Sequence, residues 1–384
     1  MPATADRFFK KLDNVEYGRV ELMTPDGRTR TFEGAKPGPS AQIHLKNWDV
    51  LPNLAAKGDV GLAQDYQVGN WETDDLQSLL SFALANGQVM EKYLHGNKLL
   101  QIGMRLMYLL RSNNRKGSKR NIQAHYDLGN SFYALWLDRT MTYSSAIFGT
   151  GTETLESAQH RKYDRIIDRI DRKSGSILEI GCGWGGFGER ALERGDFGVR
   201  GITLSEEQRR FANSRLQGRA DIVLEDYRDQ RGLFDNIVSI EMFEAVGERY
   251  WPVYFQKIQA LLAKKGKAVI QTITIDDAHF DRYRKGGDMI RSFIFPGGML
   301  PSPRRFQQEA EKAGLRMTDR FDFGQDYATT LEKWMANFDA NTHAVKALGF
   351  NDEFIRLWRF YLAACIAGFR TRRTDVMQVE LQHA

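Results

Sequence analysis

Short apolar runs alternate with segments of helical periodicity between residues 176 and 274, and this alternation constrains the fold more than any other feature. The apolar runs are Ser176–Ile180, Val199–Leu204, Asn236–Ile240 and Lys267–Thr274. Strands separated by helices run parallel and bury both faces, so the pattern predicts an α/β domain with a doubly wound, mostly parallel sheet. One intervening helix is predicted by apolar residues on a single face: Trp251, Tyr254, Phe255, Ile258 and Leu261.

Three closely spaced glycines, Gly181, Gly183 and Gly185, follow the first of these predicted strands directly. Glycines in this place let a ligand approach the backbone at the start of the next helix, as in nucleotide-cofactor sites. The spacing also satisfies the dinucleotide fingerprint. That fingerprint requires an acidic residue at the end of the second strand, where this chain has Thr203-Leu204-Ser205.

Carboxylates near the glycines indicate which class of nucleotide cofactor this site would bind. Glu179 comes just before the glycines, and Asp226 precedes the third predicted strand. S-adenosylmethionine carries a sulfonium, an amine, a ribose and an adenine but no phosphate, so it needs carboxylates and hydroxyls rather than an anion cradle. These residues therefore favour S-adenosylmethionine over a nicotinamide dinucleotide.

The first segment of the chain has a different, mixed pattern. Alternating runs at Arg19–Met23 and Thr29–Phe32 flank a Pro-Asp-Gly turn and predict a hairpin, and apolar residues spaced from Leu76 to Leu84 predict a helix. Polar, basic residues 111–120 carry no apolar period. We therefore expect a smaller N-terminal α+β domain at 1–110, a basic linker at 111–120 and a catalytic domain at 121–384.

Charge and cysteine content indicate where such a protein works. The only cysteines are Cys182 and Cys365, which excludes a disulfide scaffold and fits a reducing cytoplasm. Eight basic residues and no acid lie between Lys92 and Tyr126. Together with basic and aromatic residues near 282–295, they predict peripheral binding to an anionic membrane. The residues in that second segment are Arg282, Tyr283, Arg284, Lys285, Arg291, Phe293, Ile294 and Phe295.

Several longer motifs resemble those of the cyclopropane-fatty-acyl-phospholipid synthases. The resemblance extends over nearly the whole chain. It rests on Gly58-Asp59-Val60-Gly61-Leu62-Ala63, His125-Tyr126-Asp127, Met141-Thr142-Tyr143-Ser144, Leu155-Glu156-Ser157-Ala158-Gln159, the glycine motif, Thr203-Leu204-Ser205-Glu206-Glu207-Gln208, Asp226-Tyr227-Arg228-Asp229, Phe243-Glu244-Ala245-Val246-Gly247 and Phe295-Pro296-Gly297-Gly298.

This resemblance implies an S-adenosylmethionine-dependent enzyme that acts on the double bond of an unsaturated phospholipid acyl chain. It also implies a class I methyltransferase domain, Rossmann-like, preceded by a lipid- and dimer-associated domain, and hence a homodimer. The residues implied to line the cofactor are Tyr143, Ser144, Gly181, Gly183, Gly185, Thr203, Leu204, Gln208, Asp226 and Tyr227.

The family uses a bound bicarbonate as the base that removes a proton after methyl transfer. By motif, its binding residues fall on Ser145, Glu244, Gln271, Ile273 and Tyr327. Two positions depart from the family, because Ser145 stands where the family has Cys and Gln271 stands where it has His. Both can still hydrogen-bond, but neither titrates near neutral pH. The product is therefore either a cyclopropane or, with a shifted base, a methyl- or methylene-branched chain.

Three other functions have a basis in the sequence. Small-molecule amine N-methyltransferases are similar around Glu241-Met242-Phe243-Glu244, although they rely on a nearby His where this chain has Ala245. A non-enzymatic lipid-binding protein would have a degenerate cofactor site, which the complete glycine loop argues against. No basic-aromatic motif of an RNA-binding protein is present, so nucleic acid is not expected as a partner. The histidines lack metal-ligand spacing, and no metal is expected.

Overall fold

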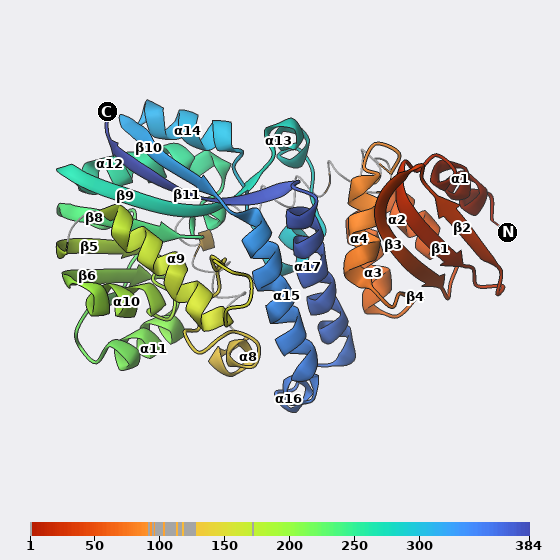
Figure 1. Ribbon diagram of the computed structural model, residues 1–384, viewed down its shortest axis with the longest axis horizontal. Helices are drawn as coiled ribbons and strands as arrows, with labels where there is room; N and C mark the ends of the chain where they lie inside the picture. Colours follow the sequence, from red (N-terminus) through yellow and green to blue (C-terminus); the bar gives the residue numbers. More distant parts are fainter. Residues whose placement is uncertain are drawn as a thin grey trace. The chain divides into compact units, whose positions relative to one another are not determined.

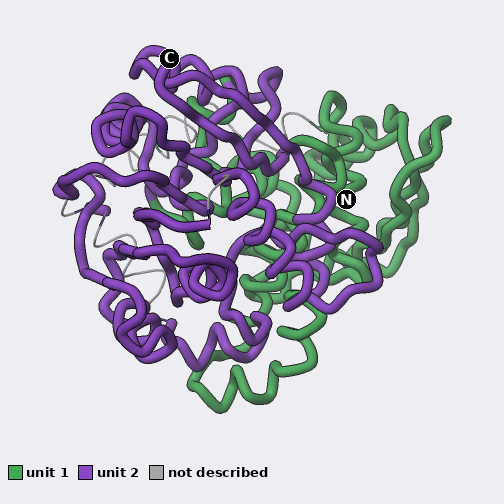
Figure 2. Tube along the Cα trace, turned by 60° about the vertical axis from the view of Figure 1, so that its left-hand side comes forward, with its two compact units in different colours: residues 1–110, 281–296, 334–373 green, residues 111–280, 297–333, 374–384 purple. Residues whose placement is uncertain are grey.

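The computed structural model describes residues 2–90, 93, 96, 103, 113, 117–118, 128–170 and 173–384 (Figure 1). Two compact units divide the chain (Figure 2). Unit 1 is Met1–Leu110, Asp281–Pro296 and Trp334–Arg373, and unit 2 is Arg111–Phe280, Gly297–Lys333 and Thr374–Ala384. Unit 1 therefore contains two later segments besides residues 1–110. The division into an N-terminal domain, a basic linker at 111–120 and a catalytic domain stays a prediction.

Unit 2 contains the predicted mostly parallel sheet. Its strand order is β10-β11-β9-β8-β5-β6-β7. The five strands from β9 to β7 are parallel to one another. β11 pairs antiparallel with β9 on one side and with β10 on the other. The predicted α/β class I methyltransferase fold is confirmed. The strands are β5 (Ser174–Ile180), β6 (Asp196–Thr203), β7 (Asp221–Leu224), β8 (Phe234–Ile240), β9 (Leu262–Ile275), β10 (Leu315–Asp322) and β11 (Thr374–His383).

The helices of unit 2 pack in two sets. α9 contacts α10, and α12 contacts α14, while α9 and α12 both contact β9. All five residues of the predicted apolar face on α12 are buried. The helical elements are α8 (Asn130–Ala134), α9 (Leu155–Ile170), α10 (Gly186–Arg194), α11 (Glu206–Leu216), η1 (Phe243–Ala245), η2 (Glu248–Tyr250), α12 (Trp251–Leu261), α13 (Asp277–Tyr283, which ends in unit 1), α14 (Pro303–Lys312) and α15 (Gly324–Ala340, which continues into unit 1).

Besides β11, two strands of unit 2, β7 and β10, have no counterpart among the four apolar runs of the sequence. β7 has only four residues and one buried side chain. β10 forms the sheet edge, and its eight residues alternate polar side chains with few apolar ones. Pairing with β6 and β11 stabilises both, and this information is not local.

Unit 1 has a four-stranded sheet of order β2-β1-β3-β4. The predicted hairpin is confirmed, because β1 pairs antiparallel with β2, and the helix from Leu76 is confirmed with Asp75 accepting a hydrogen bond from the Ser78 N–H as its N-cap. α17 packs on α3 and α4. The elements are α1 (Ala3–Leu12), β1 (Tyr17–Met23), β2 (Thr29–Glu33), β3 (Lys36–Leu45), α2 (Val50–Lys57), α3 (Asp59–Gln67), β4 (Trp71–Glu72), α4 (Leu76–Ala85), η3 (Ile290–Ile294), α16 (Thr342–Ala347) and α17 (Asp352–Arg370).

The predicted membrane segments are described only in part. The eight basic residues between Lys92 and Arg120 and the motif at 125–127 lie outside the described residues. In the second segment Arg282, Lys285 and Phe293 are exposed. The expectation that Arg291 and Ile294 face a membrane is wrong, because both are buried: the Arg291 guanidinium pairs with Asp288 and donates to two backbone carbonyls of its own loop. Every helix in the described part of the chain is too short or too polar to span a bilayer.

Candidate active site

Two loops meet where the strand order of the unit 2 sheet reverses. From β5 the chain proceeds outward through β6 to β7, and then returns to β8 on the other side of β5. The loops after β5 and β8 therefore leave the carboxyl ends of neighbouring parallel strands, which is where ligands bind in such sheets. A Cβ on Gly181 would lie only 2.9 Å from the Cγ of Met242, so the two loops are in close contact.

The glycine loop after β5 has the backbone that its sequence predicts. Gly181, Gly183 and Gly185 all adopt positive φ angles of 83°, 51° and 84°. The N–H groups of Gly181 and Cys182 both donate to the carbonyl of Ile202, which ties the loop to β6. Space above Gly183 is open, since no atom lies within 4 Å of where a Cβ would be. A flat ligand can therefore approach this backbone.

Glu179, the last acidic residue before the glycines, is 3% exposed. Its Oε2 has no hydrogen-bond partner among the described residues. Burial raises the pKa of this carboxyl well above its usual range, and only the nearby Lys162 opposes that shift. A buried carboxyl with an unused oxygen beside an open glycine backbone fits a ligand that brings an amine or hydroxyl, as S-adenosylmethionine does.

The segment after β6 is shaped by its own hydrogen bonds. Ser205 caps α11 by accepting from the N–H of Gln208, and the Thr203 hydroxyl donates to the side-chain oxygen of Gln208 at 2.8 Å. Thr203 and Gln208 are buried, and Leu204 is half-buried. This arrangement fixes the three predicted cofactor residues of the segment relative to the glycine loop, which hydrogen-bonds to the same strand.

Asp226 and Tyr227 follow β7, the next strand along. The Asp226 carboxylate is held by the guanidinium and the N–H of Arg228. Tyr227 packs against the ring of Tyr254, and burial raises its phenol pKa to about 12. Both predicted residues thus have fixed orientations at the same end of the sheet.

Tyr143 and Ser144 lie in the segment before α9, which is separate from the loops that follow the strands. The Tyr143 ring packs on Tyr133 and Trp136, at 5.5 and 5.3 Å between centroids. The Ser144 hydroxyl accepts a 2.7 Å hydrogen bond from Lys162 Nζ. Lys162 is fully buried, and this burial lowers its pKa to about 7, against the opposing charges of three buried or nearby carboxylates.

A second carboxylate cluster follows β8, and its centre is Glu241. Its Oε1 accepts hydrogen bonds from the Ser145 N–H at 2.9 Å and the Gln271 side chain at 2.7 Å, and its Oε2 accepts one from the Tyr327 hydroxyl at 2.6 Å. Ser145, Gln271 and Tyr327 are three of the five residues that the family resemblance assigns to bicarbonate. The structure brings them together, around a carboxylate of the chain itself.

The remaining two residues of that set, Glu244 and Ile273, bond to each other. The Glu244 Oε1 accepts from the Ile273 N–H and from the Thr272 hydroxyl, while its buried Oε2 has no partner among the described residues. Burial first, and the charge of Glu241 second, raise the pKa of Glu244 to about 8. Glu244 is therefore protonated at neutral pH and presents an O–H donor.

Glu241 and Lys162 were not predicted as site residues. Glu241 follows the predicted strand at 236–240 directly, at its carboxyl end, and that position was a usable signal. Lys162 gave no such signal, because a lysine on a helix is ordinarily exposed. Its burial results from the packing of α9 against the sheet. No group of three or more His, Cys, Asp or Glu residues in the described ranges is arranged to hold a metal ion.

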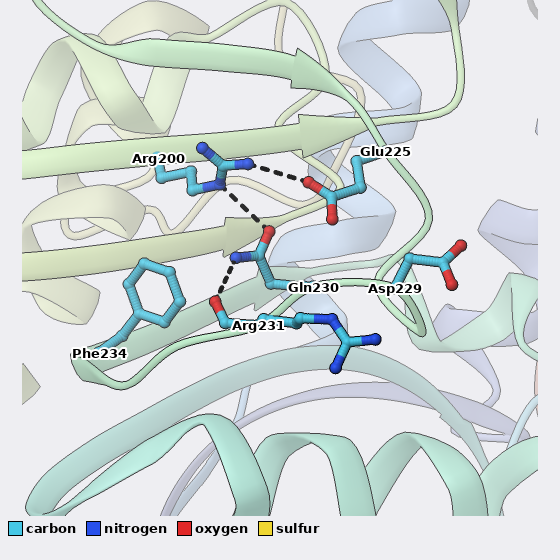
Figure 3. Close-up of a pocket in the computed structure, with 6 residues that line it drawn as sticks. All are labelled: Arg200, Glu225, Asp229, Gln230, Arg231 and Phe234. Carbon is cyan, nitrogen blue, oxygen red and sulfur yellow. Dashed lines mark hydrogen bonds and ion pairs between the residues drawn. The ribbon is translucent and has the colours of Figure 1, made fainter.

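An open pocket of about 580 Å³ lies elsewhere in unit 2 (Figure 3). It is lined by none of the predicted site residues. Arg200 donates to Gln230 and Glu225 across it, and Gln230 donates to the carbonyl of Arg231 (Figure 3). These bonds connect Arg200, Glu225 and Gln230 to one another and to the Arg231 backbone.

Known proteins similar to this chain identify the chemistry. Residues 113–379 match the family described as mycolic acid cyclopropane synthetase. The chain is 36% identical over 375 residues to tuberculostearic acid methyltransferase of Mycobacterium tuberculosis, covering 94% of this chain and 86% of that relative. It is 35% identical over 343 residues to cyclopropane-fatty-acyl-phospholipid synthase of Escherichia coli, covering 88% and 87%.

A solved structure extends the similarity to three dimensions. A mycolic acid cyclopropane synthase complexed with SAH and CTAB superposes with a TM-score of 0.65 at 32% identity, covering 69% of this chain and 98% of that one. SAH is S-adenosylmethionine after loss of its methyl group. The predicted cofactor, S-adenosylmethionine, is confirmed by these relatives.

Proposed function

Because this chain belongs to the mycolic acid cyclopropane synthetase family and is an S-adenosylmethionine-dependent methyltransferase, we propose that it modifies unsaturated phospholipids. The family transfers a one-carbon unit to lipid double bonds. In the proposed reaction the acceptor is the double bond of a phospholipid acyl chain, and the product is a cyclopropane. The observation that supports this most is the carboxyl cluster in the loop after β8, because Met242 of the same loop lies against the glycine loop after β5.

The cofactor, when bound, supplies an electrophilic methyl group. Glu179, the glycine loop and the segment from Thr203 to Gln208 would hold it, with Asp226 and Tyr227 at the adenosine end and Tyr143 and Ser144 on the other side. An alkene is a weak nucleophile, so the residues of the site act by positioning the double bond against the methyl and by excluding water. Ser145, Glu244, Gln271, Ile273 and Tyr327 are proposed as the catalytic group.

The methylated chain is a carbocation, and the carbon that loses a proton next determines the product. Loss from the new methyl, with a bond to the cationic carbon, closes the ring, whereas loss from the carbon that bears the methyl leaves a methyl-branched alkene. A methylene branch forms when a hydride first shifts to the cationic carbon and the methyl then loses the proton. Branching is the second candidate, since Gln271 replaces the family His and holds a carboxylate, Glu241, within the cluster. A relative named as a methyltransferase supports the same alternative.

The lipid itself lies in a membrane, so the enzyme must reach it there. We propose peripheral binding to an anionic surface in the cytoplasm, with exposed Arg282, Lys285 and Phe293 among the contacts, and a homodimer as the functional form. Exposed charges are screened within about 10 Å at 0.1 M salt, so this binding should weaken as salt is added.

One experiment tests these statements together. Purified enzyme is incubated with vesicles of monounsaturated phosphatidylglycerol and methyl-labelled S-adenosylmethionine, at low and high salt, and the lipids are analysed by mass spectrometry and NMR. We expect one labelled carbon per modified chain, at the former double bond, formed more slowly in high salt. Label in an added amine and none in lipid would overturn the proposal in favour of N-methylation. Cofactor binding without any label transfer would favour a lipid-binding protein.

A further inference from the structure

The donors implied to hold bicarbonate are already occupied by a carboxylate of the chain. The N–H of Ser145, the side-chain amide of Gln271 and the hydroxyl of Tyr327 all donate to Glu241. A carboxylate and a bicarbonate ion are both planar oxyanions that need the same donors. A second anion in this buried place would be unsolvated and repelled by the first. The residues present therefore do not fit bicarbonate.

The orientation of the buried amides also makes Glu241 an acceptor. Arg165 can only donate, and it donates to the side-chain oxygen of Gln378 at 2.9 Å. Gln378 must then donate through its NH₂, which it does to the side-chain oxygen of Gln271 at 2.9 Å. Gln271 in turn has its NH₂ directed at Glu241. A chain of donors thus runs from the partly exposed guanidinium of Arg165 to the half-buried carboxylate of Glu241.

All three groups bonded to the Glu241 carboxyl are therefore donors, and donors favour the ionised form. Burial raises the pKa of Glu241, while these three bonds and the charge of buried Lys162 oppose that rise. Neighbouring Glu244 has only one oxygen satisfied and keeps its proton to about pH 8. The two carboxyls accordingly differ, Glu241 being the anion and Glu244 the acid.

The backbone at Glu241 is also unusual. Its φ angle is 49°, in the left-handed region that favours glycine, and few non-glycine residues among those described adopt it. The Glu241 N–H donates to the carbonyl of Gln271, so both backbone and side chain connect the same two residues. A strained conformation that is held in this way at a candidate site indicates a role for the side chain.

We propose that the Glu241 carboxylate is the built-in general base of this enzyme and replaces an external bicarbonate. The inference rests on the proposed function. In the step, the π electrons of the double bond form a C–C bond to the cofactor methyl while the S–C bond breaks and leaves a neutral thioether. The resulting carbocation then gives one proton to a Glu241 oxygen, and the C–H electron pair forms the new C–C bond of the ring or the new C=C bond. The proton leaves Glu241 for solvent before the next turnover.

The test uses the full-length enzyme in buffer freed of carbon dioxide. Glu241→Gln keeps the size of the side chain, and Glu241→Gly removes the carboxylate at a φ angle that glycine tolerates. We expect the wild-type rate to be unchanged by removing bicarbonate. Both variants should lose about 10²–10⁴-fold in rate, the range for a general base. Bicarbonate or formate added at constant pH and ionic strength should restore part of the Glu241→Gly rate.

Controls separate this role from a structural one. Glu309 is a buried glutamate of unit 2, 5% exposed, and lies outside the site, so Glu309→Gln should keep its rate and show no response to formate. Cofactor affinity, measured by calorimetry, should be unchanged in Glu241→Gly. A wild-type rate that falls without bicarbonate, or a Glu241→Gln variant that keeps its rate, overturns the proposal. If the wild-type enzyme labels no lipid at all, the proposed function itself has failed instead.

Discussion

The two loops at the reversal point of the sheet differ in how the sequence encodes them. The loop after β5 is local: three glycines within five residues produce its backbone, and two N–H groups tie it to the adjacent strand. The cluster after β8 is assembled from four distant segments, with Ser145, Glu241, Gln271 and Tyr327 contributing one group each. In the proposed function, the first loop binds a cofactor common to many enzymes, whereas the second determines which chemistry follows. Specific chemistry here depends on long-range contacts.

The largest effect is expected in the local loop. In Gly185→Val the backbone must hold a branched side chain at a φ angle of 84°, and a Cβ there would lie 3.1 Å from the Cβ of Ala212. Because the loop cannot keep its shape, we expect cofactor affinity to fall by at least about 100-fold, and catalysis with it. Isothermal titration with S-adenosylmethionine measures this directly. Near-normal affinity in a folded variant would mean that the cofactor binds elsewhere.

A change in the long-range cluster should lower the turnover rate and leave cofactor affinity nearly unchanged. Gln378→Met keeps the volume but removes the amide that connects Arg165 to Gln271. The Gln271 amide is then free to rotate, and this buried group loses a partner at a cost of about 1–3 kcal/mol. We expect the turnover rate to fall about tenfold while cofactor affinity stays within about twofold.

The matched control for that variant is on the same strand. Gln382→Met removes an amide that donates only to Glu380, away from the cluster, and should leave both quantities unchanged. Equal losses of affinity and rate in Gln378→Met would contradict the division between the two loops, since they would indicate general damage to unit 2. A drop in turnover alone supports it.

This contrast also explains what the sequence could predict. The glycine loop, Thr203, Gln208 and the strands before them follow from short-range patterns, and the structure has them where they were expected. Family motifs placed Ser145, Gln271 and Tyr327 on one site but assigned them to bicarbonate, whereas in the structure they donate to Glu241. Glu241 was visible in the sequence at the end of a strand. Its three partners come from residues 30 to 96 positions away along the chain, and no local pattern encodes such contacts.

The burial of Lys162 and the hydrogen-bond relay from Arg165 through Gln378 and Gln271 to Glu241 could not be predicted either, because both depend on contacts between distant segments. Lys162 belongs to a helix whose other charged residues are exposed or half-buried, and only the packing of α9 makes it a buried cation. Gln378 lies on the last strand, 107 positions from Gln271, and the two meet because β11 pairs with β9 in that register. A shift of one residue would move Gln378 to the opposite face of the sheet and abolish the relay.

The smallest effect is a pH-dependent change in stability, and it tests whether the two carboxyls after β8 are coupled. Folded Glu244 keeps its proton to about pH 8, whereas the unfolded chain releases it near 4.5. Between these values the unfolded state binds fewer protons, so Glu244 makes folding less favourable as pH rises from 4.5 to about 8. Glu244→Gln is neutral throughout. Its Tm should therefore match the wild type at pH 4.5 and exceed it by about 5 °C at pH 8.

The charge of Glu241 contributes to holding that proton, so the two carboxyls should not act independently. In a Glu241→Gly background the pKa of Glu244 should fall, because one of the two causes that raise it is removed. The Tm gain from Glu244→Gln at pH 8 should then shrink, and a double-mutant cycle across the pH range measures the difference. If the gain stays the same size in both backgrounds, Glu241 carries no charge at that pH, and it could not act as a base for the lipid cation.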